Sequence, residues 1–119
     1  MRTVDQARSE GVLVGPSTTI QEASAAMLDR HVEAVIVVDR AGVCGLVTAA
    51  DVVRALADGR DATSTPVTAV ARADAPLVHA SEPLAEVHQR MRAAGHPLAV
   101  VLDDRGEPVG LLVDHEAGP

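Results

Sequence analysis

The chain has 119 residues, which is material for one domain, and it carries a formal charge of −7 with an apolar content of 47%. It contains no Phe, Tyr or Trp, so its core must be aliphatic and it cannot stack bases on aromatic rings as single-strand nucleic-acid binders do. The negative charge repels phosphate backbones, so nucleic acid is not an expected partner. The single cysteine, Cys44, excludes a disulfide framework within the chain. No signal-peptide pattern and no apolar run near 18 residues is present, so we expect a cytoplasmic protein without membrane contact.

The sequence repeats itself at an offset of 64 residues, at which Met27 aligns with Met91. Further matches at this offset are Ala7 with Ala71, Arg8 with Arg72, Leu13 with Leu77, Val14 with Val78, Glu22 with Glu86, Val37 with Val101 and Gly42 with Gly106. One inserted residue near Val109 then aligns Gly45 with Gly110. Each half is near the size at which a core is marginal alone. We therefore expect residues 1–61 and 62–119 to fold together as one pseudo-symmetric module.

The first half predicts a mixed α/β order. Its predicted elements are a short helix at 4–8, a strand at 12–14, a helix at 20–30, strands at 34–38 and 43–48, and a helix at 51–57. Apolar residues recur at helical spacing from Ile20 onward. The turn PSTT at residues 16–19 supplies N-cap candidates, and Glu22 lies in the first helical turn. The β-branched run AVIVV at 34–38 is typical of a strand that is buried on both faces.

The second half repeats this order. Its predicted elements are a short helix at 67–71, a strand at 76–79, a helix at 83–94 and strands at 98–102 and 108–113. Pro83 suits the first helical turn, where its missing N–H costs little. Few residues follow Val113, so the helix that follows Thr48 has little or no counterpart here.

The strongest local signal is the segment GLVTAAD at residues 45–51, where a strand becomes a helix. Such a junction presents free N–H groups and a partial positive charge, which can bind a phosphate together with the Thr48 hydroxyl. The Asp51 carboxylate could accept hydrogen bonds from vicinal ribose hydroxyls, as an acidic residue does in dinucleotide-binding folds. The alternative is ordinary helix capping by Thr48 and Asp51, and the residues alone leave both interpretations open.

The repeated order of elements, together with Val37-Val38-Asp39, Gly42 and the 45–51 segment, resembles a tandem pair of CBS domains across essentially the whole chain. The resemblance implies an α+β fold of two pseudo-symmetric β-α-β-β-α repeats packed as one disc-like module. It also implies a regulatory module without catalytic activity. Such pairs commonly bind AMP, ADP, ATP or S-adenosylmethionine between the repeats, and they usually form homodimers that regulate another domain or protein.

The resemblance also assigns roles to individual residues. Thr48 would contact ribose or phosphate and Asp51 the ribose hydroxyls. The adenine would lie near the other repeat's residues Leu77, Val78, Gly95, His96 and Pro97. Arg54, one helical turn after Asp51, could reach a phosphate, although a solvated or ion-paired arginine is an equally good interpretation.

The second repeat departs from this pattern, because Val113 and Glu116 stand where the first repeat has Thr48 and Asp51. Val113 lacks the hydroxyl, and Glu33, on the facing segment of the first repeat, adds negative charge beside any phosphate. We therefore expect a single ligand site, the one that contains Asp51.

The remaining reactive side chains predict no chemistry. The five histidines, His31, His79, His88, His96 and His115, lack the close spacing of metal ligands, so no metal site is expected. We expect His88 to face solvent and Cys44 to be an inert buried thiol. Met27 and Met91 are expected in the core. No cofactor is expected beyond a regulatory ligand.

Three functions from different classes are compatible with the sequence. The first is a small-molecule sensor that binds an adenosyl ligand at one site. The second is a ligand-free structural or dimerisation module in which Thr48 and Asp51 only cap a helix. The third, a hydrolase or transferase, has little support because no nucleophile motif is present. The sequence identifies neither the ligand nor the regulated partner.

Overall fold

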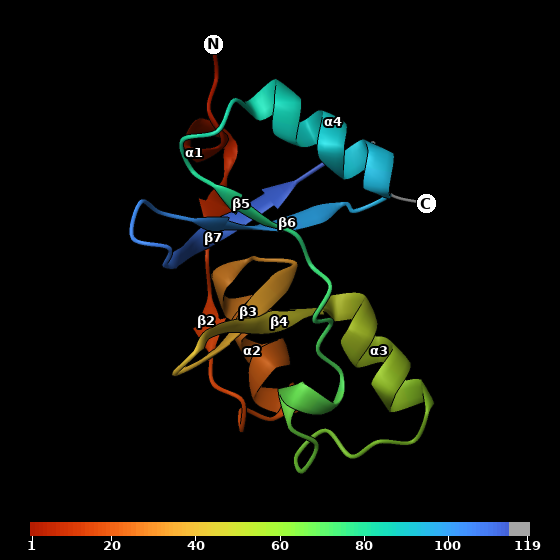
Figure 1. Ribbon diagram of the computed structural model, residues 1–119. Helices are drawn as coiled ribbons and strands as arrows, with labels where there is room; N and C mark the ends of the chain where they lie inside the picture. The colour runs from red at the N-terminus through yellow and green to blue at the C-terminus, as the bar shows by residue number, and fades with distance from the viewer. Residues whose placement is uncertain (115–119) are drawn as a thin grey trace. The chain divides into compact units, whose positions relative to one another are not determined.

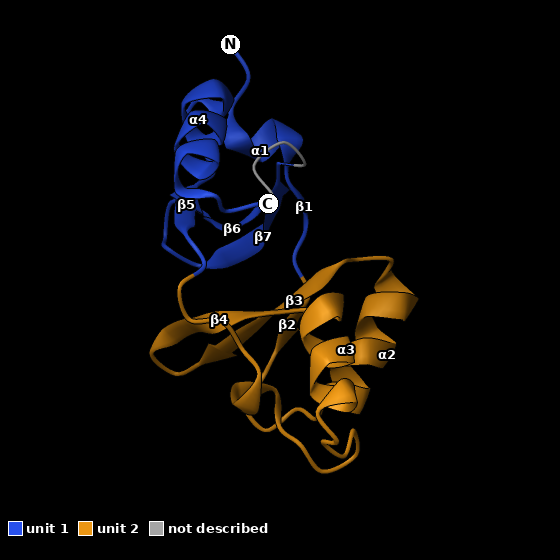
Figure 2. Ribbon diagram, turned by 90° about the vertical axis from the view of Figure 1, so that its right-hand side faces the viewer, with its two compact units in different colours: residues 1–11, 75–119 blue, residues 12–74 orange. Residues whose placement is uncertain are grey.

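The computed structural model describes residues 1–114 and shows a mixed α/β chain that forms two compact units (Figures 1 and 2). Unit 1 consists of residues 1–11 together with residues from 75 onward, and unit 2 consists of residues 12–74. The elements in chain order are α1 (Val4–Ala7), β1 (Ser9–Glu10), β2 (Leu13–Val14), α2 (Ile20–Arg30), β3 (Ala34–Asp39), β4 (Gly42–Thr48), α3 (Ala49–Ala57), the 3₁₀ helix η1 (Val67–Ala69), β5 (Leu77–His79), α4 (Leu84–Ala94), β6 (Leu98–Leu102) and β7 (Pro108–Val113).

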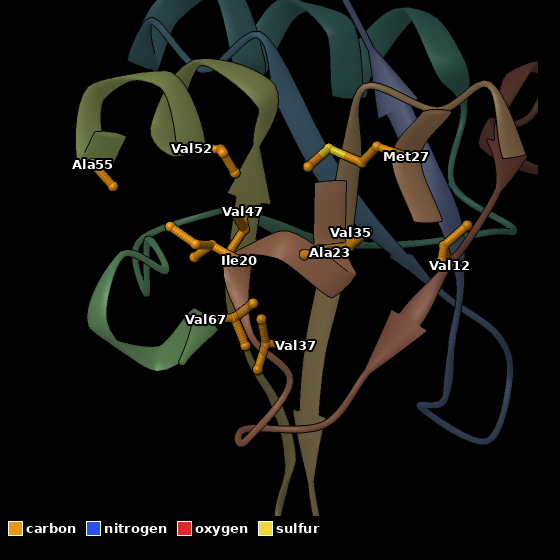
Figure 3. Close-up of a cluster of buried hydrophobic side chains, with 10 residues drawn as sticks. All are labelled: Val12, Ile20, Ala23, Met27, Val35, Val37, Val47, Val52, Ala55 and Val67. Atoms are coloured by element: carbon orange, nitrogen blue, oxygen red, sulfur yellow. The ribbon is translucent and has the colours of Figure 1, made fainter. Parts of the chain in front are cut away.

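Unit 2 is a three-stranded sheet of order β2-β3-β4 with α2 and α3 packed on one face (Figure 1). Strand β2 runs parallel to β3, and β3 runs antiparallel to β4. Residues 34–37 of β3 have no exposed surface, so the prediction of a strand buried on both faces is confirmed. The core between sheet and helices is aliphatic and is shown in Figure 3; its buried members are Val12, Ile20, Ala23, Met27, Val35, Val37, Val47, Val52, Ala55 and Val67.

Unit 1 is a four-stranded sheet of order β1-β7-β6-β5, accompanied by α1 and α4. Strand β5 runs parallel to β6, while β7 runs antiparallel to both β6 and β1. Met91 is 2% exposed in this core and Met27 is 6% exposed in the other, which confirms both as core residues. The remaining buried members of the unit 1 core are Val4, Val78, Leu84, Val87, Ala99, Val101 and Leu112.

The strand pair β3–β4 in unit 2 and the strand pair β6–β7 in unit 1 have equivalent registers, and each pair has an irregularity at the equivalent position. The pairing of β3 with β4 shifts after Val37, and the pairing of β6 with β7 shifts after Val101. The structure corrects the position of the inserted residue. In the first repeat Asp39 pairs with Gly42, which lies three positions later. In the second repeat the Asp103 N–H donates to the Glu107 carbonyl, which lies four positions later. The extra residue therefore lies in the turn at 103–107 and not near Val109.

Each unit contains the leading segment of the other sequence repeat. Ser9 pairs with Leu111 in unit 1, and Arg72 forms a β-bridge with Leu46 in unit 2. The structural counterpart of Arg72 is therefore Ser9, which corrects the sequence alignment of Arg72 with Arg8. The boundaries of the compact units lie after residues 11 and 74. They differ from the predicted boundary between the sequence repeats, which lies after residue 61 and stays a prediction.

Four other elements differ from the sequence prediction. Helix α3 begins at Ala49, two residues earlier than predicted, because Thr48 both ends β4 and caps the helix. The helix predicted at 67–71 is a 3₁₀ turn that ends at Ala69. Strand β1 was not predicted, and Pro83 precedes α4 instead of occupying its first turn. Among residues 1–114, no helix has the length and apolar character needed to cross a membrane.

Candidate functional site

The junction between β4 and α3 is closed by a reciprocal pair of hydrogen bonds. The Thr48 N–H donates to Asp51 Oδ2 at 2.9 Å, and the Asp51 N–H donates to Thr48 Oγ1 at 3.1 Å. This is a capping box, which satisfies two backbone donors at the start of a helix. The capping that the sequence suggested for these residues is therefore present. Helix α2 begins in the same way, with Thr19 and Glu22.

Asp51 also holds two arginines from different parts of unit 2. Its Oδ1 accepts from Arg72 Nε at 2.9 Å and from Arg54 Nη1 at 3.2 Å. The Asp51 side chain is 3% exposed, whereas those of Arg72 and Arg54 are about half exposed. Burial opposes ionisation of Asp51, but hydrogen bonds from Thr48 and Arg72 prevail and hold its pKa below the usual value of an aspartate.

Arg72 is the residue of this cluster that the sequence did not single out. It lies 21 positions from Asp51 along the chain and reaches it because the bridge to Leu46 holds residues 71–73 along β4. The repeat drew attention to Arg72 only through its alignment with Arg8, which the structure corrects. No signal in the sequence links Arg72 to Asp51.

A cavity of about 180 Å³ adjoins this cluster within unit 2. It is lined by Asp51, Arg54, Ala55, Asp58, Arg60, Ala69 and Val70. The lining therefore combines two arginines and two aspartates with two alanines and a valine. Pockets that hold drug-sized ligands have roughly 300–1,000 Å³, so this cavity can hold only part of such a ligand.

The residues predicted to contact the adenine lie in unit 1. Leu77, Val78 and His96 line one cavity of about 240 Å³ between β5 and α4, together with Pro76, Val87, Arg90, Met91 and Ala94. Gly95 ends α4 in the left-handed conformation with φ 73°, and Pro97 accepts the Asp114 N–H at 2.9 Å. The structure thus brings Leu77, Val78 and His96 together in unit 1, and Thr48, Asp51 and Arg54 together in unit 2.

The counterpart positions of the second repeat are partly described. Val113 ends β7, whereas Glu116 and His115 lie outside the described residues. Glu33 is exposed, and its carbonyl accepts the Ala49 N–H at 3.3 Å.

Two expectations about single side chains need correction. His88 does not face solvent freely, because it is half-buried and its Nε2 is buried with no hydrogen-bond partner among the described residues. Cys44 is only half-buried, and a hydrogen bond to Asp39 together with burial raises the pKa of its thiol. Within residues 1–114, no group of three or more His, Cys, Asp or Glu side chains could hold a metal ion.

Each repeat has one parallel and one antiparallel strand pair, and the antiparallel pairs have equivalent registers. The chain is therefore an α/β protein that contains two copies of one structural repeat. The family model of the CBS domain matches residues 7–58 and 67–116, so the chain belongs to the CBS domain family. No curated protein matches the chain.

Several solved structures share the fold. An uncharacterized conserved protein from Pyrococcus horikoshii has 24% identity and a TM-score of 0.80, with 93% of this chain and 85% of that chain covered. A CBS domain protein from Pyrobaculum aerophilum, complexed with AMP, has 22% identity and a TM-score of 0.83, covering 94% and 87%. The CBS domain pair of protein MJ0100, complexed with 5′-methylthioadenosine and S-adenosyl-L-methionine, has 20% identity and a TM-score of 0.82, covering 98% and 92%.

Proposed function

We propose that the chain is a regulatory module that binds an adenosyl ligand and has no catalytic activity. The observation that carries this proposal is the buried Asp51 with its two arginines beside a cavity in unit 2. The structures from Pyrobaculum aerophilum and of MJ0100 support it, because both hold adenosyl compounds. A further neighbour, CBSX2, was also solved with AMP. CBS domain pairs are generally regulatory and not catalytic.

The proposed roles of single residues are those that the resemblance to CBS domain pairs implies. Thr48, Asp51 and Arg54 serve the ribose and phosphate end of the ligand. Leu77 and Val78 supply apolar contacts for the adenine. The proposed adenine contacts in the loop after α4 are Gly95, His96 and Pro97. Because Val113 cannot replace Thr48, we propose one ligand per chain.

A ligand regulates only if it binds two conformations of the protein with different affinities. The partner that responds would therefore contact a surface that differs between the free and the bound chain. We also propose that the chain forms a homodimer, because Val53 and Leu56 expose apolar side chains on the outer side of α3, at 65% and 48% exposure.

One observation favours a second candidate, a structural module without ligand. Thr48 and Asp51 satisfy each other in a complete capping box, and α2 has the same box at Thr19 and Glu22, where no ligand role is proposed. The Asp51–Arg72 ion pair likewise stabilises the fold without a ligand. In this alternative, the cluster around Asp51 only fixes α3 and the segment at residues 71–73.

Isothermal titration of the purified chain with AMP, ATP and S-adenosylmethionine separates the two candidates. We expect one molecule of ligand per chain, and we expect Thr48→Ala to weaken AMP binding at least tenfold. Thr19→Ala is the matched control, because it removes the same type of cap at a cost of about 1 kcal/mol and leaves the ligand residues unchanged. Absence of binding for all three compounds would establish the structural alternative, and two ligands per chain would overturn the one-site proposal.

A further inference from the structure

The carboxylate of Asp51 is already occupied by donors from the protein. Its Oδ2 accepts the Thr48 N–H, and its Oδ1 accepts both Arg72 Nε and Arg54 Nη1. A carboxylate offers about four acceptor positions, and three of them are filled on a side chain that is 3% exposed. Asp51 therefore has about one acceptor position left for a hydroxyl group of a ligand while these contacts persist.

The two arginines have the opposite character. Their side chains are 52% and 61% exposed for Arg72 and Arg54. Among hydrogen bonds within residues 1–114, the guanidinium group of Arg72 uses only Nε and that of Arg54 only Nη1. Both terminal nitrogens of Arg72 are therefore available, and Asp51 fixes the plane of its guanidinium group. A guanidinium group held in this way is suited to bidentate binding of a phosphate.

The size of the adjoining cavity and the charge of the cluster around Asp51 favour the same type of ligand group. Arg54 and Arg60 line it together with Asp51 and Asp58, so the charges of the lining itself balance. Arg72 does not line the cavity but bonds Asp51 at its edge, and with Arg72 the cluster has three cationic groups against two carboxylates. This local excess of positive charge stands out in a chain with a formal charge of −7. The cavity of about 180 Å³ is large enough for a phosphate group and too small for a whole adenosyl ligand.

We propose that Arg72 and Arg54, positioned by Asp51, bind the phosphate of the ligand, so that this chain selects phosphate-bearing adenosyl compounds over neutral or cationic ones. Arg72 is the specificity-determining residue, and Asp51 acts as its positioning residue. This inference rests on the proposed function, because it concerns the charge of the ligand that the same site takes.

The test compares three adenosyl compounds that differ in charge at the 5′ position: AMP, the neutral 5′-methylthioadenosine and the cationic S-adenosylmethionine. Dissociation constants are measured by titration for the wild-type chain and for Arg72→Gln, Arg54→Gln and Arg92→Gln. Arg92→Gln is the matched control, because Arg92 is 47% exposed and bonds the buried Asp114 at 2.9 Å, as Arg72 bonds Asp51. Thermal unfolding of each variant is recorded in the same buffer.

We expect the wild-type chain to bind AMP at least tenfold more tightly than either other compound. Arg72→Gln should remove most of this preference while leaving the affinity for 5′-methylthioadenosine within about threefold, Arg54→Gln should reduce the preference less, and Arg92→Gln should not change it. Equal affinities for AMP and 5′-methylthioadenosine would overturn the inference and leave the proposed function intact, as would an unchanged preference in Arg72→Gln and Arg54→Gln. If no compound binds the wild-type chain, the proposed function fails and this inference falls with it. If Arg72→Gln does not fold, the Arg54→Gln measurement decides.

Discussion

Gly45 lies where two backbones come close together in unit 2. A Cβ atom added at Gly45 would lie 2.5 Å from the Arg72 carbonyl oxygen, which belongs to the segment bridged to β4. Gly110 occupies the same place in unit 1, where a Cβ atom would collide with the Ser9 carbonyl oxygen. The repeat therefore keeps glycine at both positions because the neighbouring chain leaves no room for a side chain.

We predict that Gly45→Ala lowers the free energy of unfolding by about 1–3 kcal/mol, because backbone atoms must shift to admit the methyl group. Urea unfolding followed by circular dichroism measures this, since the chain has no Trp or Tyr for fluorescence. Gly15→Ala is the control, because nothing lies within 4 Å of a Cβ atom there and its φ is not positive. The control should be neutral or more stable by less than about 1 kcal/mol. Equal losses in both variants would show that the contact with Arg72 does not matter.

The residues of the candidate site, and His88 outside it, differ in how far the sequence could predict them. Thr48 and Asp51 were found because a cap and its partner lie three positions apart, and this spacing is visible in the sequence. Arg72 was missed because its contact with Asp51 depends on a β-bridge between segments 26 positions apart at Leu46 and Arg72. His88 was misplaced because its half-burial depends on how α4 packs, whereas its sequence neighbours Gln89 and Arg90 are exposed.

At the scale of single elements, the sequence predicts the first and last residues correctly where caps, turn residues or regular apolar spacing mark them. Helix α2 has the predicted bounds Ile20–Arg30, because Thr19 caps its start and its apolar spacing is regular. Strands β6 and β7 also have their predicted bounds, since turn residues separate two apolar runs. Strand β1 has two exposed residues and exists only through its pairing with β7 about 100 positions later. No periodicity exists in a strand of that length, so the sequence could not predict it.

Helix α3 exposes two large apolar side chains, Val53 and Leu56. Val53 and Leu56 lie three positions apart on α3, so they share one side of the helix. Among the described residues, α4 has no exposed large hydrophobic side chain. We predict that Val53→Glu weakens the proposed homodimer at least tenfold, because a carboxylate would be buried in an apolar interface.

Light scattering coupled to gel filtration measures the mass of each variant across a range of concentrations. Ala93→Glu, at an exposed position of α4, is the control that adds the same charge elsewhere and should leave the mass unchanged. A wild-type chain that is monomeric at all concentrations, or a Val53→Glu chain that remains dimeric, would contradict the proposal.

At the scale of the whole molecule, the order of the chain and the composition of the compact units differ. Residues 1–11 belong to unit 1, where the Val4 N–H donates to the Glu82 carbonyl and the Asp5 N–H to the Ala80 carbonyl. Residues 62–74 belong to unit 2, where the Val67 N–H donates to the Thr18 carbonyl. The internal repeat revealed that the fold contains two similar halves, but it could not reveal this exchange, because an alignment carries no contact information.

The assignment of residues 1–11 to unit 1 and of residues 62–74 to unit 2 predicts which backbone amides exchange faster when one core is destabilised. Val37 and Val101 are counterparts in the repeat, and each is fully buried in the core of its own unit. Replacing either by Ala should cost about 1.5–3 kcal/mol, a loss that opens mainly the unit concerned. In native-state hydrogen exchange of the full chain, Val101→Ala should accelerate the amides of Val4 and Asp5 about tenfold or more. Val37→Ala should accelerate exchange of the Val67 amide to the same extent and leave exchange of the Val4 amide slow.

Two outcomes would contradict this prediction. If the Val4 and Asp5 amides instead respond to Val37→Ala, residues 1–61 open as one unit, and residues 1–11 do not unfold together with unit 1. Equal responses of all these amides to both substitutions would mean that the chain opens only as a whole.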